Sequence, residues 1–251
     1  MNSGYYIVFG LVLALLFGAT ESHAQKPEIE KSYAMFRTEA FGGLNFNTNG
    51  WGCSFYYSKH KTAKIKRLYL IQFDVVKHPK EYKIYNPLDE NSKGYVFGKM
   101  NAFSTLDFGT GHKIIIHEKL RQKGVQLSMN WNVGLSAGFV KPVYLEIIKF
   151  DGLQVAGIAV EKYDPESHNL NNIYGRAPNT KGLLELKIIP GAFFKGGFNF
   201  EFSSIRDGLK ALEIGTKVNI YPRRIPIMTN VDNKFIFTEF YLCLQFGKKY
   251  I

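Results

Sequence analysis

Strict alternation of apolar and polar residues from Val125 to Phe139 is the feature that most constrains this chain. Every odd-numbered residue of the segment is apolar, and every even-numbered one is polar or glycine. Because successive side chains of a β-strand point to opposite faces, the pattern predicts a strand with one apolar and one polar face. The segment is much longer than the roughly 5 to 6 residues of a typical globular strand, and it exceeds the roughly 9 to 11 residues that a tilted strand needs to cross a bilayer. We therefore interpret it as a transmembrane β-strand.

The same alternation occurs in seven other segments, each bounded by glycine, asparagine, proline or charged residues. They cover residues 36–46, 51–58, 69–75, 96–108, 194–203, 212–220 and 235–247. Eight such strands can close on themselves. The sequence therefore predicts an all-β fold, an eight-stranded antiparallel up-and-down transmembrane β-barrel.

The polar faces of these strands carry charges of both signs, interspersed with small residues. Such residues suit the narrow lumen of an eight-stranded barrel, which side chains fill. We expect a polar network in the lumen made of Arg37, Glu39, Asp74, Lys99, Asp107, Lys195, Glu201, Glu213, Lys217 and Glu239. The alternative is a soluble β-sandwich or lipocalin-type barrel with its apolar face inside. The uncharged apolar faces, with aromatic residues near strand ends such as Trp51 and Tyr69, favour the membrane barrel.

The N-terminal residues indicate export. An apolar run from Tyr5 to Ala19 precedes Ser22-His23-Ala24, a small-x-small cleavage site. We predict a signal peptide over residues 1–24, a short periplasmic tail over 25–32 and an outer-membrane barrel over 33–251. A single anchoring helix is the alternative, but the run is shorter than the roughly 20 residues of a helical span.

Basic residues concentrate in the connections expected to face the periplasm. If the chain starts there, the inner connections are 59–66, 110–124 and 203–210, and the longest connections, 77–94 and 140–182, lie outside. The formal net charge of the whole chain is +11. The expected periplasmic basic patch consists of Lys59, Lys61, Lys64, Lys66, Arg67, Lys113, Lys119, Arg121 and Lys123. It would anchor to anionic lipid head groups or bind an acidic periplasmic or envelope protein. Export argues against a nucleic-acid partner.

No sequence motif indicates catalysis, a metal site or a cofactor. The chain has no Cys/His metal spacing and no phosphate-binding loop, and Gly109-Thr110-Gly111 fits a turn better than a dinucleotide motif. His78 and His168 are the histidines expected in the outer loops, and His168 has acidic and hydroxyl neighbours that also suit an ordinary polar loop. Cys53 and Cys243 have opposite strand parity, so both are expected to be free thiols.

The chain resembles the small outer-membrane β-barrels of Gram-negative bacteria, in the broad OmpX/OmpW/PorT-like class. The resemblance rests on the strand pattern, the start at Gln25, the Gly134-Leu135-Ser136-Ala137-Gly138 strand and the Lys141-Pro142-Val143-Tyr144-Leu145 segment. The ending Lys248-Lys249-Tyr250-Ile251 departs from the terminal Phe of that class, although Phe246 or Tyr250 can serve instead. The resemblance implies an integral outer-membrane protein, and PorT-like members are associated with secretion machinery.

Three functions are compatible with these observations. The first is a non-enzymatic structural or accessory subunit of an envelope or secretion assembly. The second is a narrow pore or small-ligand conduit, and the third is an enzyme of the outer rim acting on lipid or peptide. Opposite charges inside a small barrel would pair and seal it, which favours the first function over the second.

Overall fold

The eight long strands of the chain close into one antiparallel barrel. The computed structural model describes residues 37–250, except for 87–91, 120–123, 152–153 and 204–206. Each barrel strand pairs with its sequence neighbours along the wall, and the first strand pairs with the last. The strands are β1 Thr38–Asn47, β2 Gly50–His60, β3 Ile65–Val76, β6 Asn101–His117, β7 Gln126–Pro142, β11 Lys187–Glu201, β12 Gly208–Ile220 and β13 Ile236–Tyr250. The predicted fold is confirmed, and each predicted segment falls on one of these strands.

The barrel wall has inverted polarity, with apolar side chains outside and charged ones inside. Along β7 the outward residues Met129, Val133 and Leu135 are exposed, the last at 73 %. The inward Ser128, Asn130 and Asn132 on the same strand are buried. A soluble barrel would show the opposite arrangement, because water would solvate its outer face. The outer surface is therefore suited to lipid.

Aromatic side chains lie near both ends of the apolar surface. Trp51 stands at one end, and Tyr57 and Tyr69 stand at the other with ring centroids 6.4 Å apart. The Trp131 and His112 rings have centroids 5.1 Å apart. His112 pairs with Trp131 on β7 and with Arg67 on β3, so the three residues lie at the same level of the barrel. Amphipathic rings at these depths are typical of the membrane–water interfaces.

The connections differ strongly between the two ends of the barrel. At one end, here the turn end, residues 61–64, 118–125 and 202–207 join the strands, and β1 begins and β13 finishes there. At the other, the loop end, a tight turn at 48–49 accompanies three longer connections, 77–100, 143–186 and 221–235. This asymmetry matches the prediction that the longest connections share one end.

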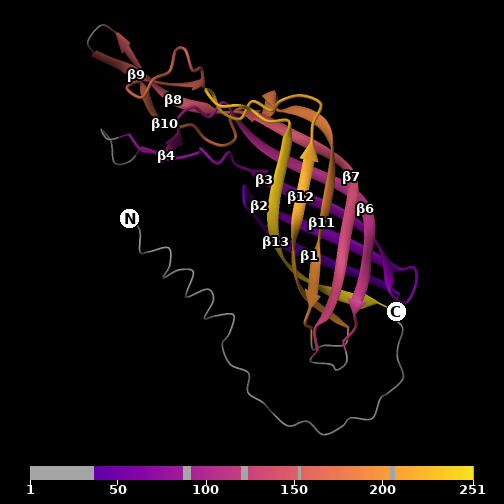
Figure 1. Ribbon diagram of the computed structural model, residues 1–251. Coiled ribbons are helices and arrows are strands. Elements are labelled where there is room, and N and C mark those ends of the chain that lie inside the picture. The colour runs from indigo at the N-terminus through magenta and orange to yellow at the C-terminus, as the bar shows by residue number, and fades with distance from the viewer. Residues whose placement is uncertain (1–36, 87–91, 120–123, 152–153, 204–206, 251) are drawn as a thin grey trace, which may run out of the picture. The chain divides into compact units, whose positions relative to one another are not determined.

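The loop end carries a smaller folded region, here the loop-end unit, which extends past the end of the barrel strands (Figure 1). A three-stranded sheet of order β10-β8-β9 is formed by β8 Tyr144–Asp151, β9 Gln154–Lys162 and β10 Ile173–Arg176. A 3₁₀ helix, η1 Leu183–Glu185, and a short pair, β4 Lys83–Ile84 with β5 Tyr95–Val96, complete it. Its own apolar core consists of Tyr95, Leu145, Ile147, Tyr163 and Ile173.

Several predicted strand limits were wrong, since β3 begins at Ile65 rather than at residue 69 and β11 begins at Lys187 rather than at residue 194. The fourth strand begins at Asn101 rather than at residue 96, because Val96 lies in β5 and Met100 packs against the core of the loop-end sheet. The same strand continues to His117, so the expected turn from residue 110 is part of the barrel wall. Over the described ranges, no helix is long and apolar enough to cross a membrane. The predicted signal peptide and tail, residues 1–32, lie outside the described residues.

Candidate functional site: the filled lumen and the outer mouth

The half of the lumen nearer the loop end is built around Lys217. Its ammonium group donates to Asp74 and, over 2.8 Å, to Asp107. Gln72 Nε2 donates to Asp74 at 2.6 Å, and Asn219 Nδ2 donates to Asp107 at 3.0 Å. A buried ion pair is tolerated only when further hydrogen bonds satisfy both partners, and these amides do so for the two carboxylates.

The middle of the lumen is organised by the Glu213 carboxylate. It accepts hydrogen bonds from Tyr241 at 2.7 Å, Asn130 at 2.7 Å and Gln245 at 2.6 Å. Lys195 lies 3.8 Å from it and donates to the Tyr56 hydroxyl at 2.7 Å. These six side chains come from five strands, β2, β7, β11, β12 and β13, so the network ties opposite walls of the barrel together.

The half nearer the turn end is richer in lysine. Lys66 donates to Glu39 at 2.5 Å, and Lys113 donates to the Asn199 side chain at 2.9 Å. At the turn-end opening of the lumen, the Glu201 carboxylate accepts hydrogen bonds from Lys119 at 2.9 Å and from Lys249 at 2.5 Å.

Charges of the two signs balance along the lumen. The carboxylates are Glu39, Asp74, Asp107, Glu201, Glu213 and Glu239, all buried, and the ammonium groups are Lys66, Lys113, Lys119, Lys195, Lys217 and Lys249. Carboxylates predominate toward the loop end and ammonium groups toward the turn end. The central lysines, Lys66, Lys113, Lys195 and Lys217, have exposures of 0 to 2 %, so solvent does not reach them. Lys113 and Glu239 have no ion-pair partner among the described residues, but each of the other groups pairs with one of opposite sign, and this filled interior closes the lumen.

Glycines in the wall make room for aromatic rings that fill the lumen. A Cβ at Gly109 would come within 2.5 Å of Cζ of Phe193. A Cβ at either Gly197 or Gly215 would come within 2.7 Å of the Tyr241 hydroxyl oxygen. The Gly109-Thr110-Gly111 segment is therefore strand: Gly109 makes room for an interior ring, and Gly111 lies against the backbone of β7 at Trp131 and Asn132.

An apolar cap closes the lumen at the loop end. It consists of Val76, Phe103, Val140, Ile189, Tyr221, Ile225, Ile227, Met228 and Phe237. The Phe103 ring lies 5.0 Å from that of Phe237 and 5.6 Å from that of Tyr221, the latter edge to face. Such a cap excludes water and ions from the charges below it.

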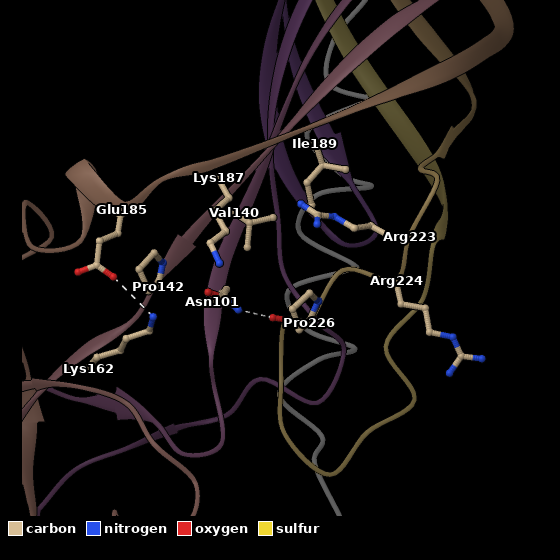
Figure 2. A pocket seen from close by; sticks show the side chains of 10 residues that line it. All are labelled: Asn101, Val140, Pro142, Lys162, Glu185, Lys187, Ile189, Arg223, Arg224 and Pro226. Carbon is tan, nitrogen blue, oxygen red and sulfur yellow. Dashed lines mark hydrogen bonds and ion pairs between the residues drawn. The ribbon is translucent and has the colours of Figure 1, made fainter.

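A pocket of about 240 Å³ remains above this cap at the loop-end mouth of the barrel, here called the outer mouth because the longest connections are predicted to lie outside (Figure 2). It is lined by Asn101, Val140, Pro142, Lys162, Glu185, Lys187, Ile189, Arg223, Arg224 and Pro226. Val140 and Ile189 belong to the cap and form an apolar part of its wall. The charged lining residues are basic except for Glu185, so the pocket is cationic.

The cations of the pocket differ in how they are paired. Lys162 lies 3.5 Å from Glu185, and Arg224 donates to Asp232 at 2.9 Å. A hydrogen bond from the Tyr144 hydroxyl, together with Lys162 and Lys187, holds the pKa of Glu185 below its usual value. In the part of the chain that the structure describes, neither Lys187 nor Arg223 has a carboxylate partner within ion-pair distance.

His168 forms part of a turn beside β9. Its Nδ1 accepts from the Asp164 backbone N–H at 3.0 Å, and its Nε2 lies 3.3 Å from Glu161. Ser167 donates to Asp164 rather than to the histidine, and this bond lowers the pKa of Asp164. Both ring nitrogens of His168 therefore hold the turn together, and the arrangement contains no activated serine.

The structure corrects the placement of several predicted site residues. Arg37 is exposed before β1, and Lys99 lies at the loop end, 2.5 Å from Glu81, so neither joins the lumen. Lys66 and Lys113, expected in the periplasmic patch, are buried in the lumen because their strands extend past the predicted ends. Lys119 reaches back to Glu201.

The other predicted residues lie where their strand parity put them. Asp74, Asp107, Lys195, Glu201, Glu213, Lys217, Glu239 and Glu39 all point into the lumen. Lys59, Lys61, Lys64 and Arg67 are exposed at the turn end, whereas Arg121 and Lys123 lie outside the described residues. The turn-end basic patch is therefore reduced, among described residues, to these four.

The sequence analysis missed the uncharged members of the network. Tyr56, Gln72, Asn130, Asn199 and Gln245 bind the charged groups directly. Each has the same inward strand parity as a charged residue on its own or a neighbouring strand. This parity is the sequence signal that could have placed these residues in the lumen. The two cysteines behave as predicted, since Cys53 is exposed on the outer surface, Cys243 is buried, and both are free.

The inverted polarity, the filled lumen and the eight-stranded closure define a transmembrane β-barrel with a sealed interior. No metal-binding group of three or more His, Cys, Asp or Glu occurs among the residues described.

Solved structures that resemble this chain include eight-stranded outer-membrane barrels. Neisserial surface protein A has a TM-score of 0.40 and 9 % identity, covering 86 % of this chain and 97 % of that one. Ail, the attachment invasion locus protein of Yersinia pestis, has a TM-score of 0.43 and 7 % identity, covering 86 % of this chain and 100 % of that one. The N-terminal β-barrel domain of Pseudomonas aeruginosa OprF has a TM-score of 0.35 and 8 % identity, covering 85 % of this chain and 96 % of that one. No protein-family model and no curated sequence matches the chain.

Proposed function

We propose that this protein is a non-enzymatic integral outer-membrane β-barrel that acts as a structural or accessory subunit of an envelope or secretion assembly. Its barrel is a sealed anchor, and its loop-end unit is the platform that meets other molecules. The observation that carries the proposal is the contrast between a lumen filled by paired charges and a loop end that has a folded core of its own.

The loop-end sheet is attached to the barrel by backbone hydrogen bonds. Met100 N–H donates to Ile227 at 2.9 Å, Val143 N–H donates to Met100 at 2.9 Å, and Tyr163 N–H donates to Val143 at 2.9 Å. These bonds connect the sheet to the connection before β6, to the end of β7 and to the connection between β12 and β13. A surface held this way is positioned by the barrel and can serve as a docking face.

Strand β9 is the part of this platform best suited to a partner. It is an edge strand of the described sheet, and its Ile158 and Val160 side chains are exposed. An exposed edge with apolar side chains offers main-chain hydrogen bonds to an added strand. At the opposite end, Lys59, Lys61, Lys64 and Arg67 would attract anionic lipid or an acidic periplasmic protein.

Orientation can be tested with single cysteines in a Cys53→Ser, Cys243→Ser background. A membrane-impermeant maleimide added to intact cells should label Ile158→Cys but not Lys61→Cys. Labelling of Lys61→Cys alone would show that the loop end faces the periplasm. Lysed cells provide the control, because both sites should then react.

The accessory role can be tested by affinity purification from detergent-solubilised outer membranes. We expect a stoichiometric partner that is lost when residues 144–177 are replaced by a short linker. The matched variant Lys59→Ser, Lys61→Ser, Lys64→Ser probes the turn end instead. Absence of a stoichiometric partner from the full-length protein would contradict the accessory role.

The conduit alternative makes a different prediction. The lumen is filled and capped, so purified protein in planar bilayers should show no stable conductance steps. Reproducible steps in the intact protein would instead identify it as a pore.

A further inference from the structure

The outer mouth combines an apolar floor with convergent cations that lack full partners. Val140 and Ile189 form the floor, and Pro142 and Pro226 restrict the backbone around it. In Figure 2 the Arg223 side chain reaches toward the group formed by Val140 and Lys187, whereas Arg224 points away from it.

On β11, Lys187 lies two residues before the inward-facing Ile189 and therefore on the same face of the strand. Its strand therefore aims it over the mouth rather than at lipid, since alternate residues share a face. Lys162 enters from β9, and its nearest carboxylate, on Glu185, is 3.5 Å away. Three strands or loops thus bring positive charge to one pocket of about 240 Å³.

We propose that this pocket is a binding site for a phosphate-type dianion, either free or as a phosphate monoester group. Lys187 and Arg223 are its principal ligands, and Lys162 contributes a third positive charge. Guanidinium and ammonium groups form strong charge-assisted hydrogen bonds with phosphate oxygens. A dianion also matches the excess of lining cations over the single carboxylate better than a monoanion does.

The layers beneath the pocket explain why an anion would stop there. The apolar cap excludes it, and below the cap Asp74, Asp107 and Glu239 outnumber the Lys217 ammonium group. The site is thus a closed-bottomed receptor at the mouth. This inference goes beyond the anchoring function, and binding at the pocket does not depend on which end of the barrel faces the medium.

The test is a chemical-shift titration of the full-length protein in phosphatidylcholine nanodiscs with inorganic phosphate at constant ionic strength. We expect saturable shifts confined to residues near 187–189 and 223–226, with a dissociation constant on the order of 1 mM. Lys187→Gln and Arg223→Gln should each weaken binding roughly tenfold. Arg224→Gln is the matched control and should change the dissociation constant less than about twofold, because Arg224 points away from the pocket and pairs with Asp232.

A second arm separates a lipid head group from a soluble phosphate. Part of the phosphatidylcholine is replaced by phosphatidic acid, or by phosphatidylglycerol as the matched anionic lipid without a monoester. If phosphate binds more weakly with phosphatidic acid but not with phosphatidylglycerol, the occupant is a lipid phosphate monoester. If phosphate binding is unchanged with both lipids, the occupant is a soluble phosphate. Absence of saturable shifts with phosphate and with phosphatidic acid, or equal losses in Arg224→Gln and Arg223→Gln, would overturn the proposal.

Discussion

The lumen and the outer mouth both concentrate charged side chains, but they treat them in opposite ways. In the lumen, Lys217 is buried between two carboxylates, which are themselves held by amides. At the mouth, Lys187 and Arg223 are exposed and lack an ion-pair partner among the described residues. The difference separates two uses of charge: a buried, fully paired group fixes the fold and closes a passage, whereas an exposed, unpaired group is available to a ligand.

The strongest way to break the lumen side of this comparison is Lys217→Met. Asp74, Asp107 and Glu239 would remain buried together without the ammonium group that offsets them. We expect the free energy of unfolding to fall by about 3 to 5 kcal/mol, measured by urea titration in lipid vesicles. Lys249→Met is the control and should cost about 1 kcal/mol or less, because Glu201 keeps Lys119. Equal losses in the two variants would refute the importance of the buried cluster.

A second variant tests the outer face of the same wall. Leu135 is 73 % exposed on the surface assigned to lipid, so Leu135→Lys should cost about 2 to 4 kcal/mol near the midplane. Leu135→Phe should be nearly neutral in the same refolding titration. If lysine is tolerated as well as phenylalanine, this face meets water and the barrel is a soluble one.

Gly109→Ala sharpens the comparison at the level of packing. The new methyl group would collide with the Phe193 ring, and overpacking of this kind typically costs about 1 to 3 kcal/mol. Trimming the ring in the double variant Gly109→Ala, Phe193→Leu should recover part of the loss, as a double-mutant cycle would show. A simple sum of the two single effects would mean that the residues do not share the space.

The smallest effect on stability is expected at the mouth. Lys187→Gln and Arg223→Gln should change the free energy of unfolding by no more than about 0.5 kcal/mol, although both should weaken phosphate binding. The same urea titration measures this. A loss comparable to that of Lys217→Met would show that the mouth cations are structural and that the contrast between the two regions is false.

The strand pattern predicted the barrel well because alternation is a local property of each segment. Ser128, Asn130 and Asn132 could be assigned to the inside without knowledge of any partner. Inward parity also extended to Lys66, which shares it with Asp74 on β3, and to Lys113, which shares it with Asp107 on β6. Both lie in segments that the lysine clusters and glycines predict to be turns.

The rest could not be predicted because it depends on contacts between distant segments. Tyr95 packs with Leu145, Ile147, Tyr163 and Ile173, and the short strands that carry these residues have little stability without that packing. The outer mouth is likewise assembled from the start of β11, the end of β9 and the loop before β13. Arg37 and Lys99 had suitable parity, but each precedes the first residue of its strand: the Arg37 side chain is exposed, and Lys99 pairs with Glu81 at the loop end.

The seam between β1 and β13 has a consequence for the biogenesis of the protein. It joins Thr38 to Tyr250 and Asn47 to Tyr241, so the strand made first receives its second neighbour only when the strand made last arrives. Until then β1 and β12 each present an open edge, and such non-local pairings form slowly. The growing chain therefore needs protection from aggregation throughout its transit. A premature stop before residue 236 would yield an open sheet rather than a smaller barrel.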